Sequence, residues 1–265
     1  MGRNIYLSVL GSSIYKECSY VKDDEGFESI KTLFVQQATL EYWNVKSWNP
    51  ESSRIFIAVT EGKGGSFESN WKDDITERYN SFTKENIPYR GLQSAIRNMG
   101  IPDSMVEAVR IPDGKDEDEI WKLFDIIYDK LEDGDILYVD MTHSFRYLPM
   151  LIIVLCNYAK FLKNVEIQGL SYGNYEARKD NKAPLIDLLP IVKLQQWTFA
   201  SADFVKNGNA SELQKLCKDI TNTLYKGRDV SPDIRNKTGL INKIVTQIEK
   251  QIELIQLCQG KEIIN

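Results

Sequence analysis

Five side chains that can bind an anion or carry a proton stand within seven residues of this sequence. They are a carboxylate, two hydroxyls, an imidazole and a guanidinium, from Asp140, Thr142, His143, Ser144 and Arg146. His143 is the only histidine among 265 residues. Hydroxyls and a guanidinium fork are donors suited to phosphate oxygens. The composition of this segment therefore favours a site for a phosphorylated ligand.

The residues on either side predict a buried strand before the segment and a buried helix after it. Ile136–Asp140 is an apolar run that ends in the carboxylate, and Tyr147–Leu162 is largely apolar. Pro149 falls in the first turn of that helix, where proline is favoured. Since a helix start exposes N–H groups and the positive end of its dipole, it adds to an anion site.

Strands and helices alternate along the first 192 residues, which predicts an α/β domain with a parallel sheet flanked by helices. The expected strands are Asn4–Leu10, Arg54–Val59, Met105–Ile111, Ile136–Asp140, Val165–Tyr172 and a returning Pro184–Leu189. The expected helices are Ile30–Trp43, Trp71–Asn80, Gly91–Met99, Glu117–Leu131 and Tyr147–Leu162. Residues 193–265 are expected to be a helical C-terminal region, with helices at Leu194–Val205, Ser211–Leu224 and Asp233–Leu257. An apolar stripe from Ile241 to Ile255 fits either packing within that region or a subunit interface.

Four loops follow strands of the predicted sheet, and the carboxyl ends of parallel strands meet at one edge. We therefore expect the loops Gly11–Ser13, Thr60–Lys63, Met141–Arg146 and Tyr172–Glu176 to gather there. Aromatic side chains near these loops offer faces on which bases can stack. They are Tyr15, Tyr20, Trp71, Tyr172 and Tyr175.

Several other kinds of site are disfavoured by their missing motifs. The loop at Gly11 has one glycine where a dinucleotide fold needs GxGxxG, and Gly62–Ser66 lacks the residue order of a P-loop. The position two residues after Asp140 holds Thr142, not the second aspartate of an aspartyl phosphatase, and GxSxG is absent. A single histidine argues against a metal centre. We expect neither a metal nor a cofactor.

The bulk composition narrows the class of protein further. A net charge of −5 argues against coating long nucleic acid. No apolar run approaches the length of a membrane span, and the first residues enter a strand pattern, so a cytoplasmic protein is expected. The cysteines lie far apart and are expected to be free thiols; they are Cys18, Cys156, Cys217 and Cys258.

The segment Asp140–Arg146 resembles the DxTHG signature of CRISPR-associated DxTHG proteins. Further segments are similar to the same family, and the resemblance covers about residues 4 to 205. They are Thr32 with Phe34–Ala38, Thr60-Glu61 with Asn70-Trp71, Pro149–Leu151, Asn157–Lys160 and Tyr172–Arg178. The resemblance implies a Rossmann-like CARF domain, a homodimer in type III CRISPR antiviral defence that binds cyclic tetra- or hexa-adenylate, a second messenger.

The family's ligand loops fall on Gly11–Ser13 and Asp140–Arg146, with Ser144 in place of the signature's glycine. Together with the loops at the predicted sheet edge, the expected ligand contacts are Gly11, Ser12, Ser13, Thr60, Glu61, Lys63, Asp140, Thr142, His143, Ser144, Phe145, Arg146, Tyr172, Gly173 and Tyr175. Slow cleavage of the bound ring is the enzymatic alternative, and its candidate residues are His143, Ser12 and Thr142.

Many relatives carry a C-terminal HEPN ribonuclease with an R-x(4–6)-H motif. Arg235 supplies the opening of that motif, but the positions for its histidine hold Leu240, Ile241 and Asn242. The resemblance therefore predicts that residues 193–265 are a truncated or reduced effector or a dimerisation segment. A separate effector protein, or a ribonuclease part missing from this chain, remains open.

Overall fold

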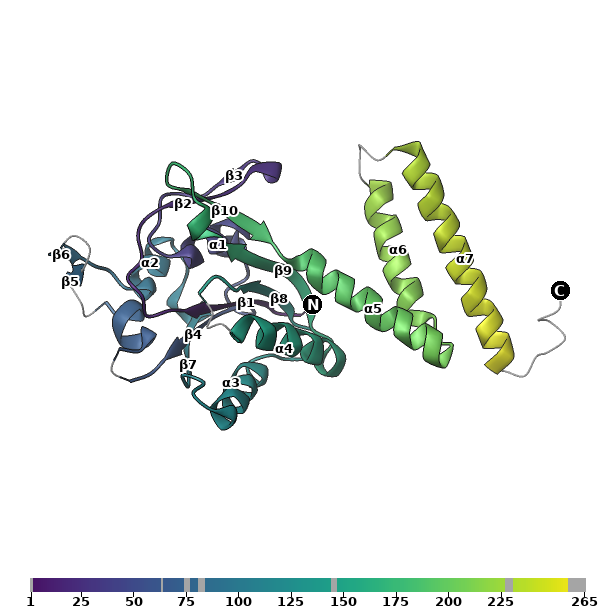
Figure 1. The fold of residues 1–265 in the computed structure, drawn as a ribbon, viewed down its shortest axis with the longest axis horizontal. Coiled ribbons are helices and arrows are strands. Elements are labelled where there is room, and N and C mark those ends of the chain that lie inside the picture. The colour runs from purple at the N-terminus through teal and green to yellow at the C-terminus, as the bar shows by residue number, and fades with distance from the viewer. Residues whose placement is uncertain are drawn as a thin grey trace. The chain divides into compact units, whose positions relative to one another are not determined.

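The computed structural model describes residues 2–62, 64–73, 77–80, 84–143, 147–226 and 231–256. It divides into two compact units, Met1–Leu189 and Pro190–Asn265. The first unit contains the sheet, and the second is helical (Figure 1).

The main sheet confirms the predicted α/β fold. Within the described residues it has eight strands in the order β3-β2-β10-β9-β8-β1-β4-β7. The neighbours from β9 to β7 run parallel, while β10 returns antiparallel to β9, as the expected hairpin requires. The strands are β1 (Asn4–Leu10), β2 (Ser19–Lys22), β3 (Phe27–Glu28), β4 (Arg54–Thr60), β7 (Val106–Ile111), β8 (Ile136–Asp140), β9 (Glu166–Gly173) and β10 (Lys182–Asp187).

Helices cover both faces of this sheet (Figure 1). Helices α1 (Val35–Tyr42) and α2 (Leu92–Asn98) lie on one face, where Leu40, Leu92 and Ile96 share a core with Tyr6 and Ile57. Helices α3 (Glu117–Asp129) and α4 (Leu148–Lys163) lie on the other. Because β1 and β4 are buried along nearly their whole length, their apolar residues face both layers.

Two predicted helices differ from the structure. The helix expected at Trp71–Asn80 is wrong: a π-helical turn spans Phe67–Trp71, and β5 (Glu77–Asn80) pairs antiparallel with β6 (Glu85–Pro88). The helix expected at Ile30–Trp43 begins only at Val35, because Thr32 forms a β-bridge with Cys18. Cross-strand pairing thus overrides a weak helical spacing in both places.

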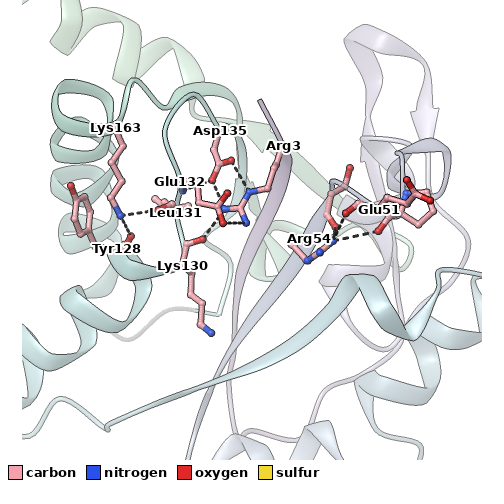
Figure 2. A network of polar contacts seen from close by, with 11 residues as sticks. Arg3, Glu51, Arg54, Tyr128, Lys130, Leu131, Glu132, Asp135 and Lys163 are labelled. Atoms are coloured by element: carbon pink, nitrogen blue, oxygen red, sulfur yellow. Dashed lines mark hydrogen bonds and ion pairs between the residues drawn. The ribbon is translucent and has the colours of Figure 1, made fainter. Parts of the chain in front are cut away.

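An ion-pair network closes the edge at which the strands begin (Figure 2). Arg3 donates to Asp135 at 3.0 and 2.8 Å and pairs with Glu132 at 2.6 Å. Lys163 donates to the carbonyls of Tyr128 and Leu131 at 2.8 Å, so α4 caps the end of α3. The network ties β1, β8, α3 and α4 together at the edge opposite to the predicted site.

The second unit consists of α5 (Leu189–Asn207), α6 (Ser211–Lys226) and α7 (Pro232–Gln256) among its described residues. The three predicted helices are confirmed, although α5 begins at Leu189, earlier than expected. Of the predicted apolar stripe, Val245 is buried while Ile241 and Ile244 are exposed. Throughout the described ranges, no helix has the length and apolar character that crossing a bilayer requires.

Candidate functional site

A row of buried polar side chains crosses the carboxyl ends of β1 and β8. Ser8 and Asp140 are paired in register, and Ser8 Oγ donates to Asp140 Oδ2 at 2.7 Å. Gln36, from α1, donates to Ser8 Oγ and to the carbonyl of Val9, each at 3.1 Å. Since burial disfavours the charged carboxylate, it raises the pKa of Asp140. Asp140 is therefore a structural acceptor, fully buried and out of reach of a ligand.

Thr142 connects this buried row to the loop that follows β9. Its hydroxyl donates to Asp140 Oδ1 at 2.5 Å, and its backbone N–H donates to the same oxygen at 3.2 Å. The N–H of Gly173 donates to Thr142 Oγ at 2.8 Å. A Cβ on Gly173 would lie 2.6 Å from the Tyr20 ring and 2.7 Å from Val35, so only glycine fits here.

Gly11, Tyr15 and His143 converge above that row. The rings of Tyr15 and His143 lie 4.3 Å apart between centroids, at an angle of 32°. A Cβ on Gly11 would lie 2.6 Å from the Tyr15 hydroxyl and 3.7 Å from His143 Cβ. The loop after β1 and the segment after β8 are thus in direct contact, as the sequence predicts for two loops at one sheet edge.

His143 is half-buried, and this burial lowers its pKa from 6.5 to about 4. Its imidazole is therefore neutral at pH 7, with one N–H donor and one nitrogen acceptor. It offers hydrogen bonds to a ligand, but neither a positive charge nor a proton ready for transfer.

Asn70 holds the loop Gly11–Ser13 in place from the π-helical turn. Its Nδ2 donates to the carbonyls of Gly11 and Ser13, at 2.6 and 2.9 Å, and Tyr89 donates to its Oδ1. With these carbonyls turned towards Asn70, Ser12 and Ser13 are exposed at the surface. Serine hydroxyls are suitable donors for phosphate oxygens.

Thr60 and Glu61 do not join this group. Thr60 is buried, accepts a backbone bond from Ser66 at 3.0 Å and donates its own N–H to Ser66 Oγ at 2.9 Å. Glu61 is exposed and pairs with Arg110 of the edge strand β7 at 3.2 Å. Thr60 therefore closes its own loop, and Glu61 faces away along the edge.

The aromatic side chains fall into two groups. Tyr20 and Trp71 are buried in the core, so they cannot stack a base without repacking. Tyr172 and Tyr175 are half-buried, and the guanidinium of Arg178 lies 3.9 Å from the centre of the Tyr175 ring. Four predicted ligand contacts lie outside the described residues: Lys63, Ser144, Phe145 and Arg146.

Sequence reasoning missed the residues that position the site. Ser8 was visible as a polar residue inside an apolar strand. Gln36 and Asn70 stand in segments that carry the family resemblance, but a sequence alone does not show which loop they bind. Their roles follow only from the register of β1 with β8 and from the π-helical turn.

Comparison with known proteins supports the same picture. The family model described as "CRISPR system endoribonuclease Csx1, CARF domain" matches residues 5–176. A curated relative, "CRISPR-associated protein MJ1674" of Methanocaldococcus jannaschii, is 36% identical over 121 residues. That match covers 43% of this chain and 19% of the relative, so the chain spans about a fifth of that protein. Because the family model matches well over half of the sequence, the chain belongs to the Csx1 CARF-domain family of type III CRISPR-associated proteins, a family that senses cyclic oligoadenylate.

Proposed function

We propose that this chain is a sensor that binds cyclic tetra- or hexa-adenylate at the carboxyl edge of its sheet. The observation that carries the proposal is the contact of Gly11 and Tyr15, from the loop after β1, with His143 after β8, in a protein of a family that senses cyclic oligoadenylate. We propose no cofactor or metal, since hydroxyls, amides and aromatic rings supply the recognition.

The exposed groups match the chemistry of the ligand. Ser12 and Ser13 present donors for phosphate oxygens, and α4 directs its positive end towards the segment after β8. The neutral ring of His143 offers a hydrogen bond and an aromatic face to an adenine.

We propose that two copies of the chain complete the site. Helix α4 begins at Leu148, after the segment Met141–Arg146, and carries large exposed apolar side chains. They are Met150, Val154, Phe161 and Leu162, with exposed fractions between 52% and 69%. An even-numbered ring with two-fold symmetry fits a cleft built from the same surface on both subunits.

We propose sensing in preference to cleavage of the ring. Cleavage needs a proton donor for the leaving oxygen, and a histidine with a pKa of about 4 carries no such proton at pH 7. The hydroxyl of Thr142 already donates to Asp140. The helical unit, Pro190–Asn265, would pass the signal to an effector, either a separate protein or a further part of a longer chain.

Isothermal titration with synthetic cyclic tetra- and hexa-adenylate tests the proposal, with linear tetra-adenylate as the ligand control. We expect one ring per two chains for one ring size, and weaker binding by His143→Ala. Lys130→Gln, at the opposite edge of the sheet, is the matched control and should bind like the wild type. Mass spectrometry of the recovered ligand should return an intact ring. No heat with either ring size would reject the proposal.

A further inference from the structure

Tyr15 covers one face of His143 in the structure. Its ring lies 4.3 Å from the imidazole, tilted by 32°, and it also lies edge-on to Phe34 at 5.7 Å. Residues 11–17 carry neither helix nor strand, so no backbone ladder fixes this position of the ring. The phenol instead fits against Gly11, where the missing side chain leaves room for its hydroxyl.

We propose that Tyr15 occupies, in the free protein, the place on His143 that an adenine base of the ligand takes on binding. The inference rests on the proposed function and adds a residue that controls access to the site. Tyrosine and adenine are both flat and aromatic, so one stacked ring replaces another. The absence of a side chain at Gly11 gives an entering base the same room that the phenol now fills.

The exchange explains two features of the site together. The ring of Tyr15 lies against the imidazole while no ligand is bound, and the imidazole is half-buried. Moving Tyr15 away also moves the stretch that leads to β2, while Asn70 continues to hold Gly11 and Ser13. In the bound state, Gly11–Ser13 then contact the phosphates, while Tyr15 moves out of the place that the base takes.

The single histidine makes the test clean, because histidine labelled with ¹³C gives one imidazole signal in the full chain. Without ligand, we expect Tyr15→Ala to move the pKa of His143 from about 4 towards its ordinary 6.5. Tyr15→Leu preserves apolar volume and should move it less. Tyr79→Ala removes an exposed tyrosine on β5 and should leave the titration unchanged. If the pKa of His143 is unchanged in both Tyr15 variants, Tyr15 does not cover the imidazole and the proposal is wrong.

The second arm adds cyclic tetra- or hexa-adenylate to the wild type. We expect the nuclear Overhauser contact between Tyr15 and His143 to disappear and contacts between His143 and adenine protons to replace it. A Tyr15 contact that survives saturation with a bound ring overturns the exchange and leaves the proposed function intact. No change in any signal with either ring, in wild type and Tyr15→Ala alike, overturns the proposed function and the exchange together.

Discussion

The backbone N–H of Gly173 donates to the hydroxyl of Thr142 at 2.8 Å, and that hydroxyl donates in turn to Asp140. One side chain thus fixes the ends of β8 and β9 relative to each other. Because Asp140 also accepts from Ser8, the end of β1 belongs to the same network. The loops that would meet a ligand therefore start from three strands whose ends are held by buried hydrogen bonds.

Replacing Thr142 by valine should destabilise the protein and weaken ring binding. The change leaves the N–H of Gly173 without its acceptor and removes one of the two hydrogen bonds that Thr142 donates to Asp140 Oδ1. An unsatisfied buried polar group costs roughly 1–3 kcal/mol. Urea unfolding and titration with the ring measure the two effects. Thr142→Ser retains the hydroxyl and is the matched control. Equal stability of the valine variant and the wild type would contradict the network.

The titration of Asp140 should lower the free energy of unfolding as the pH rises. Burial raises its pKa in the folded protein above the ordinary 3.8, so the folded state holds the proton more tightly than the unfolded chain. The contribution of Asp140 to stability is therefore greatest below 3.8 and is lost as the pH rises through the folded pKa. The asparagine in Asp140→Asn cannot titrate, so the variant should lack this loss of stability as the pH rises.

The measurement is the unfolding free energy of both proteins between about pH 3.5 and 7, with the variant subtracted from the wild type. All other carboxylates cancel in this difference. A wild type that gains stability relative to the variant as the pH rises would show that the pKa of Asp140 is lowered, and would contradict the role of its burial.

The sequence predicts the loops of the site better than their supports. The alternation of strands and helices places Gly11 and His143 at the same sheet edge, and the structure brings them together. The sequence pattern does not predict the two-residue strand β3 or the hairpin of β5 and β6, because such short strands carry almost no apolar alternation. The helix expected at Trp71–Asn80 fails for that reason.

Burial separates the aromatic candidates, which the sequence treats alike. Trp71 and Tyr20 stand near predicted loops just as Tyr15 does, but both lie in the core. Which tyrosine faces a ligand depends on how α1 and the π-helical turn pack on the sheet, and that packing is a tertiary property. Likewise, the bond from Asn70 to the carbonyl of Gly11 spans 59 residues and has no local signal.

Asn70→Asp should weaken ring binding while the fold survives. The substitution replaces the two N–H donors by an oxygen that faces the carbonyls of Gly11 and Ser13, so the loop moves away from its position. We expect a loss of affinity of roughly tenfold or more, equivalent to about 1.4 kcal/mol. Titration with the ring measures it, and circular dichroism checks the fold.

Arg3→Met is the matched stability control for that experiment. It breaks a partly buried ion pair at the opposite edge and leaves the buried carboxylate of Asp135 without its cation, which destabilises the fold by up to about 3–5 kcal/mol. Its affinity for the ring at a temperature where it is folded should equal that of the wild type. If Asn70→Asp and Arg3→Met lost affinity equally, the effect of Asn70 would be one of stability and not of loop position.

The apolar surface of α4 predicts the oligomeric state. Val154→Glu and Phe161→Glu each put a charge among the exposed apolar side chains of α4, and a charge buried in a dimer interface is costly. Light scattering should give a mass near twice 30.5 kDa for the wild type and near 30.5 kDa for the variants. Ile30→Glu adds the same charge to an exposed apolar residue outside α4 and should remain dimeric. Since the proposed site needs both copies, ring binding should decrease in proportion to the fraction of dimer. A monomeric variant that binds the ring with unchanged affinity would place the whole site within one chain.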